Sequence, residues 1–118
     1  MQIQLDATLR APGVARHRLL EWLSEAGCDE GSAADASLIV SELVTNAVVH
    51  AHSAPTVVVE RTSGRLRLEV SDGDASPPAI RSDAVVGGQG LRLVEQLSTR
   101  WGWTPIQGGK VVWAEHPC

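Results

Sequence analysis

Three polar side chains are spaced four residues apart in residues 41–50, whose sequence is SELVTNAVVH. At this spacing Glu42, Asn46 and His50 would lie in one stripe along an α-helix. The apolar residues of the same helix form a neighbouring arc, made of Ile39, Val40, Leu43, Val44 and Ala47. The stripe borders that arc, which is where the wall of a cleft would lie.

The residue types of this stripe fit metal and proton chemistry. Asparagine is unfavourable inside a helix, so Asn46 needs a reason for its position. Its side-chain oxygen is a hard ligand of the kind that Mg²⁺ prefers. Glu42, one turn earlier, could take a proton from a hydroxyl group or a water molecule beside a phosphate. The alternative is an ordinary amphipathic helix with a solvated Glu42 and a hydrogen-bonded Asn46, and the helix alone leaves it open.

Two further segments carry candidate binding residues. Asp72 ends an alternating segment, LEVSD at residues 68–72, and Gly73 follows it. Asp-Gly is also a common turn sequence, which is the alternative interpretation. The run GGQG at residues 87–90 opens into a short apolar helix beginning near Leu91. Backbone amides of glycines and a helix N-terminus can hold phosphate oxygens, whereas the alternative is a flexible linker.

Taken together, these segments resemble the histidine-kinase-like (GHKL) ATPases. ELVTNA at residues 42–47, followed by His50, is similar to the N-box of that superfamily, and most similar to its branch of bacterial anti-sigma-factor serine/threonine kinases. The resemblance implies that Asn46 binds Mg²⁺ and that Glu42 is the catalytic base. A histidine such as His50 is common at this place in the branch, with a less defined role; its alternative is a packing or capping residue at the helix end.

The same resemblance assigns the other two segments to the nucleotide. It implies that Asp72, with Gly73, reads adenine by accepting a hydrogen bond from the exocyclic amine. Gly88, Gln89, Gly90 and Leu91 then correspond to the second glycine box, beside the phosphates of ATP. The strand GGKVVW at residues 108–113 resembles the closing strand of the family. We expect Lys110 in that strand to be solvated.

The sequence departs from the family pattern at several of these places. Asp74 and Ser76 stand where the superfamily prefers two glycines after the adenine-reading aspartate. Gln89 replaces a usual arginine, which removes a cation from the phosphates. Val111 replaces a threonine on the nucleotide side. These differences put ATP turnover in question more than they do nucleotide binding.

The elements needed to position these residues can be predicted from periodicity. Strands are expected at residues 3–9, 56–62, 66–70, 100–104 and 110–115, and helices at residues 14–26, 32–51 and 91–97. Ser32 is the expected N-cap of the second helix, with Asp35 as the acidic partner of a capping box. This order predicts an α+β fold, and the resemblance implies a Bergerat-type two-layer sandwich: one mixed, mostly antiparallel sheet with three helices on one face.

Composition limits the class of protein. The 118 residues are expected to form a single domain, 1–118, and the net charge of −4 argues against direct nucleic-acid binding. No secretion signal and no membrane-spanning run is evident, so we expect a cytoplasmic protein without a membrane partner. Cys28 and Cys118 form no recognisable motif and are expected to be free thiols. The tryptophans are expected to serve packing.

Two functions follow as expectations. The first is a Mg²⁺- and ATP-dependent serine/threonine kinase whose partners, by resemblance, are a sigma factor and a STAS-type anti-sigma-factor antagonist, the latter being the substrate. The second is a nucleotide-dependent protein-binding switch with little or no kinase activity. A homodimer is implied by the resemblance alone. Metal hydrolysis through His50 and His52 is disfavoured, because a His-x-His pair on a helix cannot face one ion and no third ligand is evident.

Overall fold

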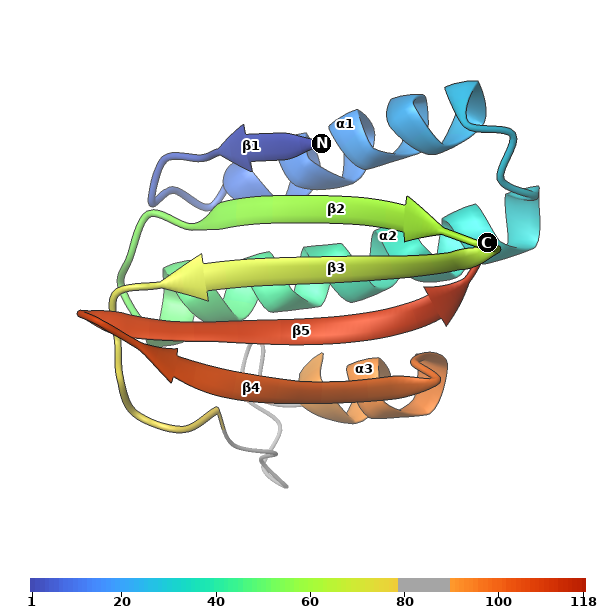
Figure 1. Ribbon diagram of the computed structural model, residues 1–118. Coiled ribbons are helices and arrows are strands. Elements are labelled where there is room, and N and C mark those ends of the chain that lie inside the picture. The colour runs from blue at the N-terminus through green and yellow to red at the C-terminus, as the bar shows by residue number, and fades with distance from the viewer. Residues whose placement is uncertain (79–89) are drawn as a thin grey trace.

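The computed structural model describes residues 1–78 and 90–118, which form one sheet with helices against one of its faces (Figure 1). The elements along the chain are β1 (Gln2–Gln4), α1 (Ala11–Glu25), α2 (Glu30–Thr45), the π-helix η1 (Asn46–His50), β2 (Thr56–Thr62), β3 (Arg65–Asp72), α3 (Gly90–Leu97), β4 (Arg100–Ile106) and β5 (Gly109–Pro117). The strand order is β1-β2-β3-β5-β4, and all pairings in the described parts of the chain are antiparallel. The predicted two-layer α+β fold with three helices on one face is confirmed.

Helix α2 is the centre of the helical layer and lies behind the middle of the sheet (Figure 1). It packs against α1 on one side and α3 on the other. On β3, the alternating residues Leu66, Leu68 and Val70 point into this layer and are at most 1% exposed. Burying a side chain of this size contributes about 1.5–3 kcal/mol relative to exposing it. Glu30–His50 is also long and apolar enough to cross a membrane, but half of its apolar window is buried, as a central core helix must be.

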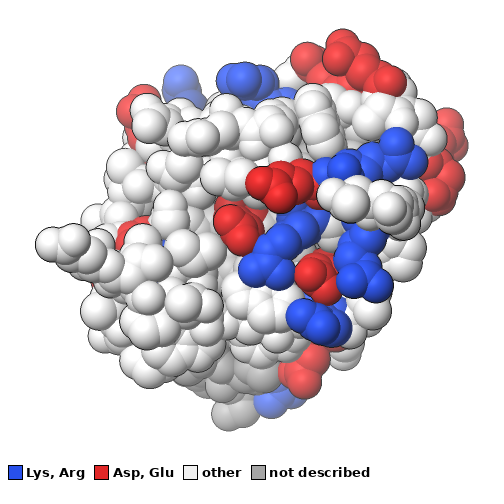
Figure 2. Space-filling model, viewed as in Figure 1, with Lys and Arg blue, Asp and Glu red and all other residues white. Residues whose placement is uncertain are grey.

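The opposite face of the sheet carries charged side chains in place of helices (Figure 2). Glu115, 8% exposed, accepts from Arg67 at 3.1 Å and lies 3.3 Å from the Arg100 Nε. The Arg67 guanidinium also stacks 4.4 Å from the centre of the Trp113 ring. These contacts cover the central strands on the side that the helices leave open.

The N-terminal part of the chain differs from the predicted pattern. The first strand ends at Gln4, and Leu9, predicted to alternate inward, is 82% exposed. A turn in which the Thr8 amide donates to the Asp6 carbonyl replaces the rest of the strand. Pro12 does not precede the helix but lies in the first turn of α1. Proline is tolerated there because the first amides of a helix have no intrahelical acceptor.

The start of α2 also differs, because Asp29 takes the role predicted for Ser32. The Asp29 carboxylate accepts a hydrogen bond of 3.0 Å from the Ser32 backbone amide, so the helix begins at Glu30. This hydrogen bond lowers the pKa of Asp29 below its ordinary value. Ser32 therefore supplies the capped amide, and the predicted Ser32–Asp35 capping box is wrong.

The prediction of free thiols is also wrong, because Cys28 and Cys118 form a disulfide. Their Cα atoms lie 5.2 Å apart although 90 positions separate them in sequence. The Arg61 guanidinium bridges the two segments that the disulfide joins, because it donates to the carbonyls of Ala26 at 2.8 Å and Cys118 at 3.1 Å. The disulfide therefore joins the connector between α1 and α2 to the end of β5, a proximity that only the folded sheet creates.

Candidate functional site

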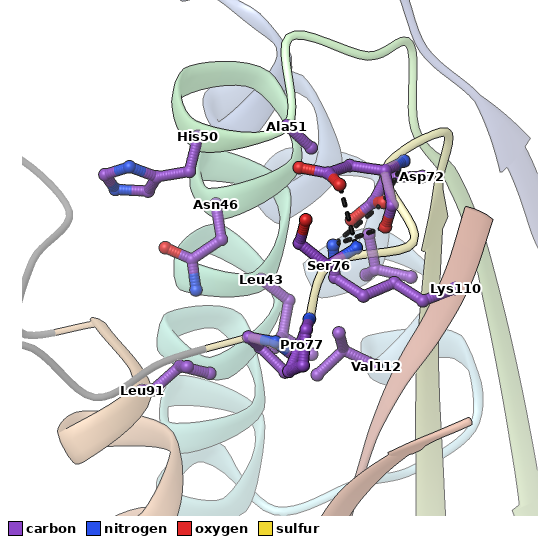
Figure 3. Close-up of a pocket in the computed structure, with 13 residues that line it drawn as sticks. Leu43, Asn46, His50, Ala51, Asp72, Ser76, Pro77, Leu91, Lys110 and Val112 are labelled. Atoms are coloured by element: carbon purple, nitrogen blue, oxygen red, sulfur yellow. Dashed lines mark hydrogen bonds and ion pairs between the residues drawn. The ribbon is translucent and has the colours of Figure 1, made fainter. Parts of the chain in front are cut away.

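A pocket of about 150 Å³ lies where the end of α2 faces the ends of β3 and β5 (Figure 3). Its lining residues come from these elements, from α3 and from the segment after β3: Leu43, Asn46, His50, Ala51, Val70, Asp72, Asp74, Ser76, Pro77, Pro78, Leu91, Lys110 and Val112. Both apolar and polar side chains line it, as in small-molecule sites. Of the predicted site residues, Asn46, His50, Asp72 and Leu91 therefore line one pocket.

The helical wall of the pocket is a π-helix where a continuous α-helix was predicted. In η1 the Ala51 amide donates to the Asn46 carbonyl at 3.1 Å, a link of five residues where an α-helix has four. The wider turn changes the register after Thr45. Asn46 and His50 both line the pocket, and Figure 3 shows them projecting from the same side of the helix. Single π-turns of this kind are frequent at functional sites.

Glu42, predicted as the catalytic base, lies one turn before Asn46 but does not line this pocket. Its side chain is half-buried, and burial raises the pKa of its carboxyl above the ordinary value. A raised pKa makes the carboxylate a stronger base.

His50 has an unusual feature in this wall. Its Nε2 atom is buried and has no hydrogen-bond partner within residues 1–78 and 90–118. Buried ring nitrogens are nearly always paired with a protein group, a water molecule or a ligand. His50 lines the pocket, so this nitrogen belongs to the wall of the candidate site.

The opposite wall contains a buried ion pair that the sequence did not predict. Lys110 Nζ lies 3.1 Å from Asp72 Oδ1 and donates to the Asp74 carbonyl oxygen at 2.8 Å. The two charged side chains are only 7% and 5% exposed. The prediction of a solvated Lys110 is therefore wrong: the strand register places it opposite Asp72 on the inner face of the sheet. The one local sign of its burial is that Lys110 directly precedes the apolar residues Val111, Val112 and Trp113.

Gly73 and Gly109 shape the backbone around this ion pair. The Gly73 amide donates to Ser53 Oγ at 2.7 Å, and Gly109 packs directly on the Asp72 backbone. Gly73 thus follows Asp72 as predicted but does not itself line the pocket. Ser53 was not predicted as a site residue, and nothing in its local sequence distinguishes it.

The glycine box is described only in part. Gly88 and Gln89 lie outside the described residues. Gly90 is the first residue of α3, and Leu91 is 3% exposed and lines the pocket. The beginning of α3 therefore lies at the edge of the pocket.

Comparison with known families matches residues 5–115 to the histidine kinase-like ATPase domain. The chain belongs to this family. Its resemblance to GHKL ATPases, inferred from the N-box, is thus confirmed over nearly the whole sequence, and ATP is the nucleotide that this domain type binds.

Solved structures of other proteins are similar to this chain in fold. The RsbU and RsbW domains of Rv1364c from Mycobacterium tuberculosis align with 99% of this chain at 28% identity and a TM-score of 0.79. The chain spans 32% of the length of that mycobacterial protein chain. The SiaB–SiaC complex of Pseudomonas aeruginosa aligns with all of this chain, over 89% of its own, at 14% identity and a TM-score of 0.65.

A sensory kinase shares the same fold. The histidine kinase domain of the blue-light activated histidine kinase from Erythrobacter litoralis aligns with 95% of this ATPase domain and 64% of its own chain, at 20% identity and a TM-score of 0.56. At these identities the SiaB–SiaC and Erythrobacter structures show the fold alone.

Proposed function

We propose that the pocket binds Mg-ATP, with Asn46 as the protein ligand of Mg²⁺ and Asp72 as the adenine reader. The observation that carries this proposal is that Asn46 and Asp72 come from different elements, α2–η1 and β3, and line the same small pocket. A purine and a triphosphate need such separate contacts at their two ends. The Nε2 of His50 supports the proposal, because a bound ligand would supply its missing partner.

The residues present fit one magnesium ion. Mg²⁺ is usually held by one or two protein oxygens together with phosphates and several water molecules. The described residues contain no group of three His, Cys, Asp or Glu side chains that would form a complete metal site. Asn46 supplies a single amide oxygen, which suits an ion that arrives with the nucleotide. When bound, Mg²⁺ neutralises negative charge on the phosphates during transfer.

The start of α3 fits the phosphates. Amide groups at a helix N-terminus point outward and favour an anion. Leu91 lines the pocket, so the N-terminus of α3 lies beside it. We assign Gly88, Gln89 and Gly90 to the phosphate side on the sequence resemblance.

For the activity, we propose phosphoryl transfer from ATP to a serine or threonine of a STAS-type antagonist, as in anti-sigma-factor kinases. Glu42 takes the proton of the acceptor hydroxyl. The oxygen of that hydroxyl forms the bond to the γ-phosphorus, and the bond from the γ-phosphorus to ADP breaks. The match to RsbW domains and the raised pKa of Glu42 support this assignment. A sigma factor is the proposed second partner, and a homodimer the proposed assembly.

The second candidate is a nucleotide-dependent switch that binds partners without phosphorylating them. The position of Glu42 outside the residues that line the pocket favours it, as do Gln89 and Val111 in place of the usual Arg and Thr. Transfer of label from [γ-³²P]ATP to a purified STAS-type antagonist separates the two candidates. Labelling that Glu42→Ala abolishes supports the kinase, whereas stable nucleotide-dependent binding without labelling supports the switch.

Calorimetric titration with Mg-ATP, Mg-ADP and Mg-GTP tests the nucleotide site itself. We expect adenine nucleotides to bind and Mg-GTP to bind at least tenfold more weakly. Equal binding of adenine and guanine nucleotides would contradict the assignment of Asp72.

A cytoplasmic location, which was expected from the sequence, is also a proposal. Stable disulfides are uncommon in the reducing cytosol. Alkylation in freshly lysed cells shows whether Cys28 and Cys118 are free or paired, and so tests both the location and the disulfide. Free thiols in cells that become paired after purification would agree with the proposed location.

A further inference from the structure

The buried cation beside the proposed adenine site has no role in the function described so far. Among the described residues that line the pocket, Lys110 is the sole Lys or Arg. Its side chain is 7% exposed, and its amino group lies between Asp72 Oδ1 and the Asp74 carbonyl. Desolvating an ammonium group is costly unless it is paired, so its position is maintained by these two acceptors.

The contacts of Asp72 are divided unequally between its two oxygens. Oδ1 accepts from the Asp74 amide at 2.9 Å and from Lys110 Nζ at 3.1 Å. No protein donor from the described parts of the chain binds Oδ2. Two donors therefore hold Oδ1, whereas Oδ2 is left as an acceptor for a ligand. Figure 3 shows Asp72 and Lys110 side by side at the pocket.

We propose that Lys110 is a specificity-determining residue: by pairing with Asp72 Oδ1, it keeps Asp72 in the acceptor-only form that distinguishes a 6-amino purine from a 6-oxo purine. This inference rests on the proposed nucleotide site. Adenine donates from its 6-amino group to such an acceptor, whereas the 6-oxo group of hypoxanthine or guanine would face it with a second acceptor. Without Lys110, a buried Asp72 avoids its uncompensated charge by taking up a proton, and a protonated carboxyl can donate to an oxo group.

Other ionisable groups near this pair do not replace Lys110. Asp74 adds negative charge, and its own carboxylate is bound by the Ser76 amide at 2.8 Å. His50 lines the pocket from η1. The pKa of Asp74 is lowered chiefly by the hydrogen bond from Ser76, with smaller contributions from Lys110 and His52. Neither histidine forms a hydrogen bond with Asp72 in the described structure. Among the described residues, loss of Lys110 therefore leaves Asp72 without a paired cation.

The test compares binding of Mg-ADP and Mg-IDP, whose bases differ in the 6-amino or 6-oxo group and in the hydrogen that hypoxanthine carries on N1. The parent protein should prefer Mg-ADP by at least tenfold. Lys110→Met should reduce this preference to about twofold or less, mainly through tighter Mg-IDP binding, and Lys110→Arg should keep it. Should Lys110→Met fail to fold, as judged by thermal unfolding, Lys110→Gln removes the same charge while keeping a polar side chain.

A double-mutant cycle with Asp72→Asn makes the test specific. Asp72→Asn alone should lose the preference, and adding Lys110→Met should change it no further. A merely structural role for Lys110 would weaken Mg-ADP and Mg-IDP equally and leave their ratio unchanged, which would overturn this inference. If the parent protein bound neither nucleotide, the proposed function itself would fail. A parent that binds Mg-ADP selectively, with Lys110→Met equally selective, would refute only the role of Lys110.

Discussion

Gly109 packs so closely on Asp72 that a Cβ atom at position 109 would overlap the Asp72 carbonyl oxygen. The two residues lie on neighbouring strands, and Gly109 comes one position before Lys110, the residue that pairs with Asp72. The absence of a side chain at Gly109 therefore lets β5 approach the end of β3 closely enough to form the buried ion pair.

Replacing this glycine should damage both stability and the site. We expect Gly109→Ala to lower the free energy of unfolding by about 1–3 kcal/mol, because the added methyl group must displace backbone. Urea denaturation measures this change. Gly13→Ala is the matched control, since its Cβ would meet nothing closer than 3.7 Å, and it should stabilise α1 by about 0.5–1 kcal/mol. Equal effects of the two substitutions would show that the contact at Gly109 is unimportant.

Asn46→Ala should remove the magnesium dependence of nucleotide binding. We expect the affinity for ATP in the presence of Mg²⁺ to fall at least tenfold, toward the value without the ion, because the amide oxygen is lost. Calorimetry with and without Mg²⁺ measures it. Thr45→Ala is the control, since Thr45 bonds to the Ser41 carbonyl and does not line the pocket. An unchanged dissociation constant for Asn46→Ala would count against its assignment as the ligand.

Glu42→Gln should raise stability while it removes activity. The pKa of Glu42 is raised by burial, so the unfolded state ionises more readily and stability falls as the pH rises above the unfolded value of 4.5. The substitution removes this cost, and its stabilising effect should be present at pH 7 and vanish below pH 4.5. Thermal unfolding across this range tests it, with Glu60→Gln on β2 as an exposed control. A pH-independent difference would contradict the assignment.

Asp29→Ala should destabilise the start of α2 at neutral pH, an effect opposite in sign to that of Glu42→Gln. The pKa of Asp29 is lowered by the Ser32 amide, so its stabilising effect is present above the ordinary value of 3.8 and is lost as the pH falls through the lower folded value. The midpoint of thermal unfolding should drop at pH 7 and converge with that of the parent in acid. Asp29→Asn, which keeps the cap without ionising, should retain most of the stability at neutral pH.

Reduction of the Cys28–Cys118 bond should lower stability strongly. A link across 90 positions removes much of the conformational entropy of the unfolded chain, for an effect of about 4 kcal/mol. Urea denaturation with and without dithiothreitol measures it. Cys28→Ser should unfold like the reduced parent and should not respond to the reductant. Identical midpoints for the oxidised and reduced parent protein would show that the bond does not stabilise the fold.

Local sequence patterns predicted most of the fold and half of the site. The strands expected at residues 56–62 and 66–70 form the central hairpin, and the spacing of Asn46 from Glu42 predicted the helical wall. The π-helix was missed because nothing in residues 46–50 indicates a five-residue turn. Lys110 was missed because its environment depends on Asp72, which is 38 residues away in sequence. Local patterns describe one element at a time, whereas these features arise between elements.

The Cys28–Cys118 disulfide was missed for the same reason, because its two cysteines lie 90 positions apart in sequence. All residues that line the pocket fall between positions 28 and 118, inside a covalent ring. A single proteolytic cut anywhere in that ring would open the polypeptide without releasing a fragment. Nicked molecules would migrate as one species until a reductant is added, and both walls of the pocket would stay tethered while the backbone between them was broken.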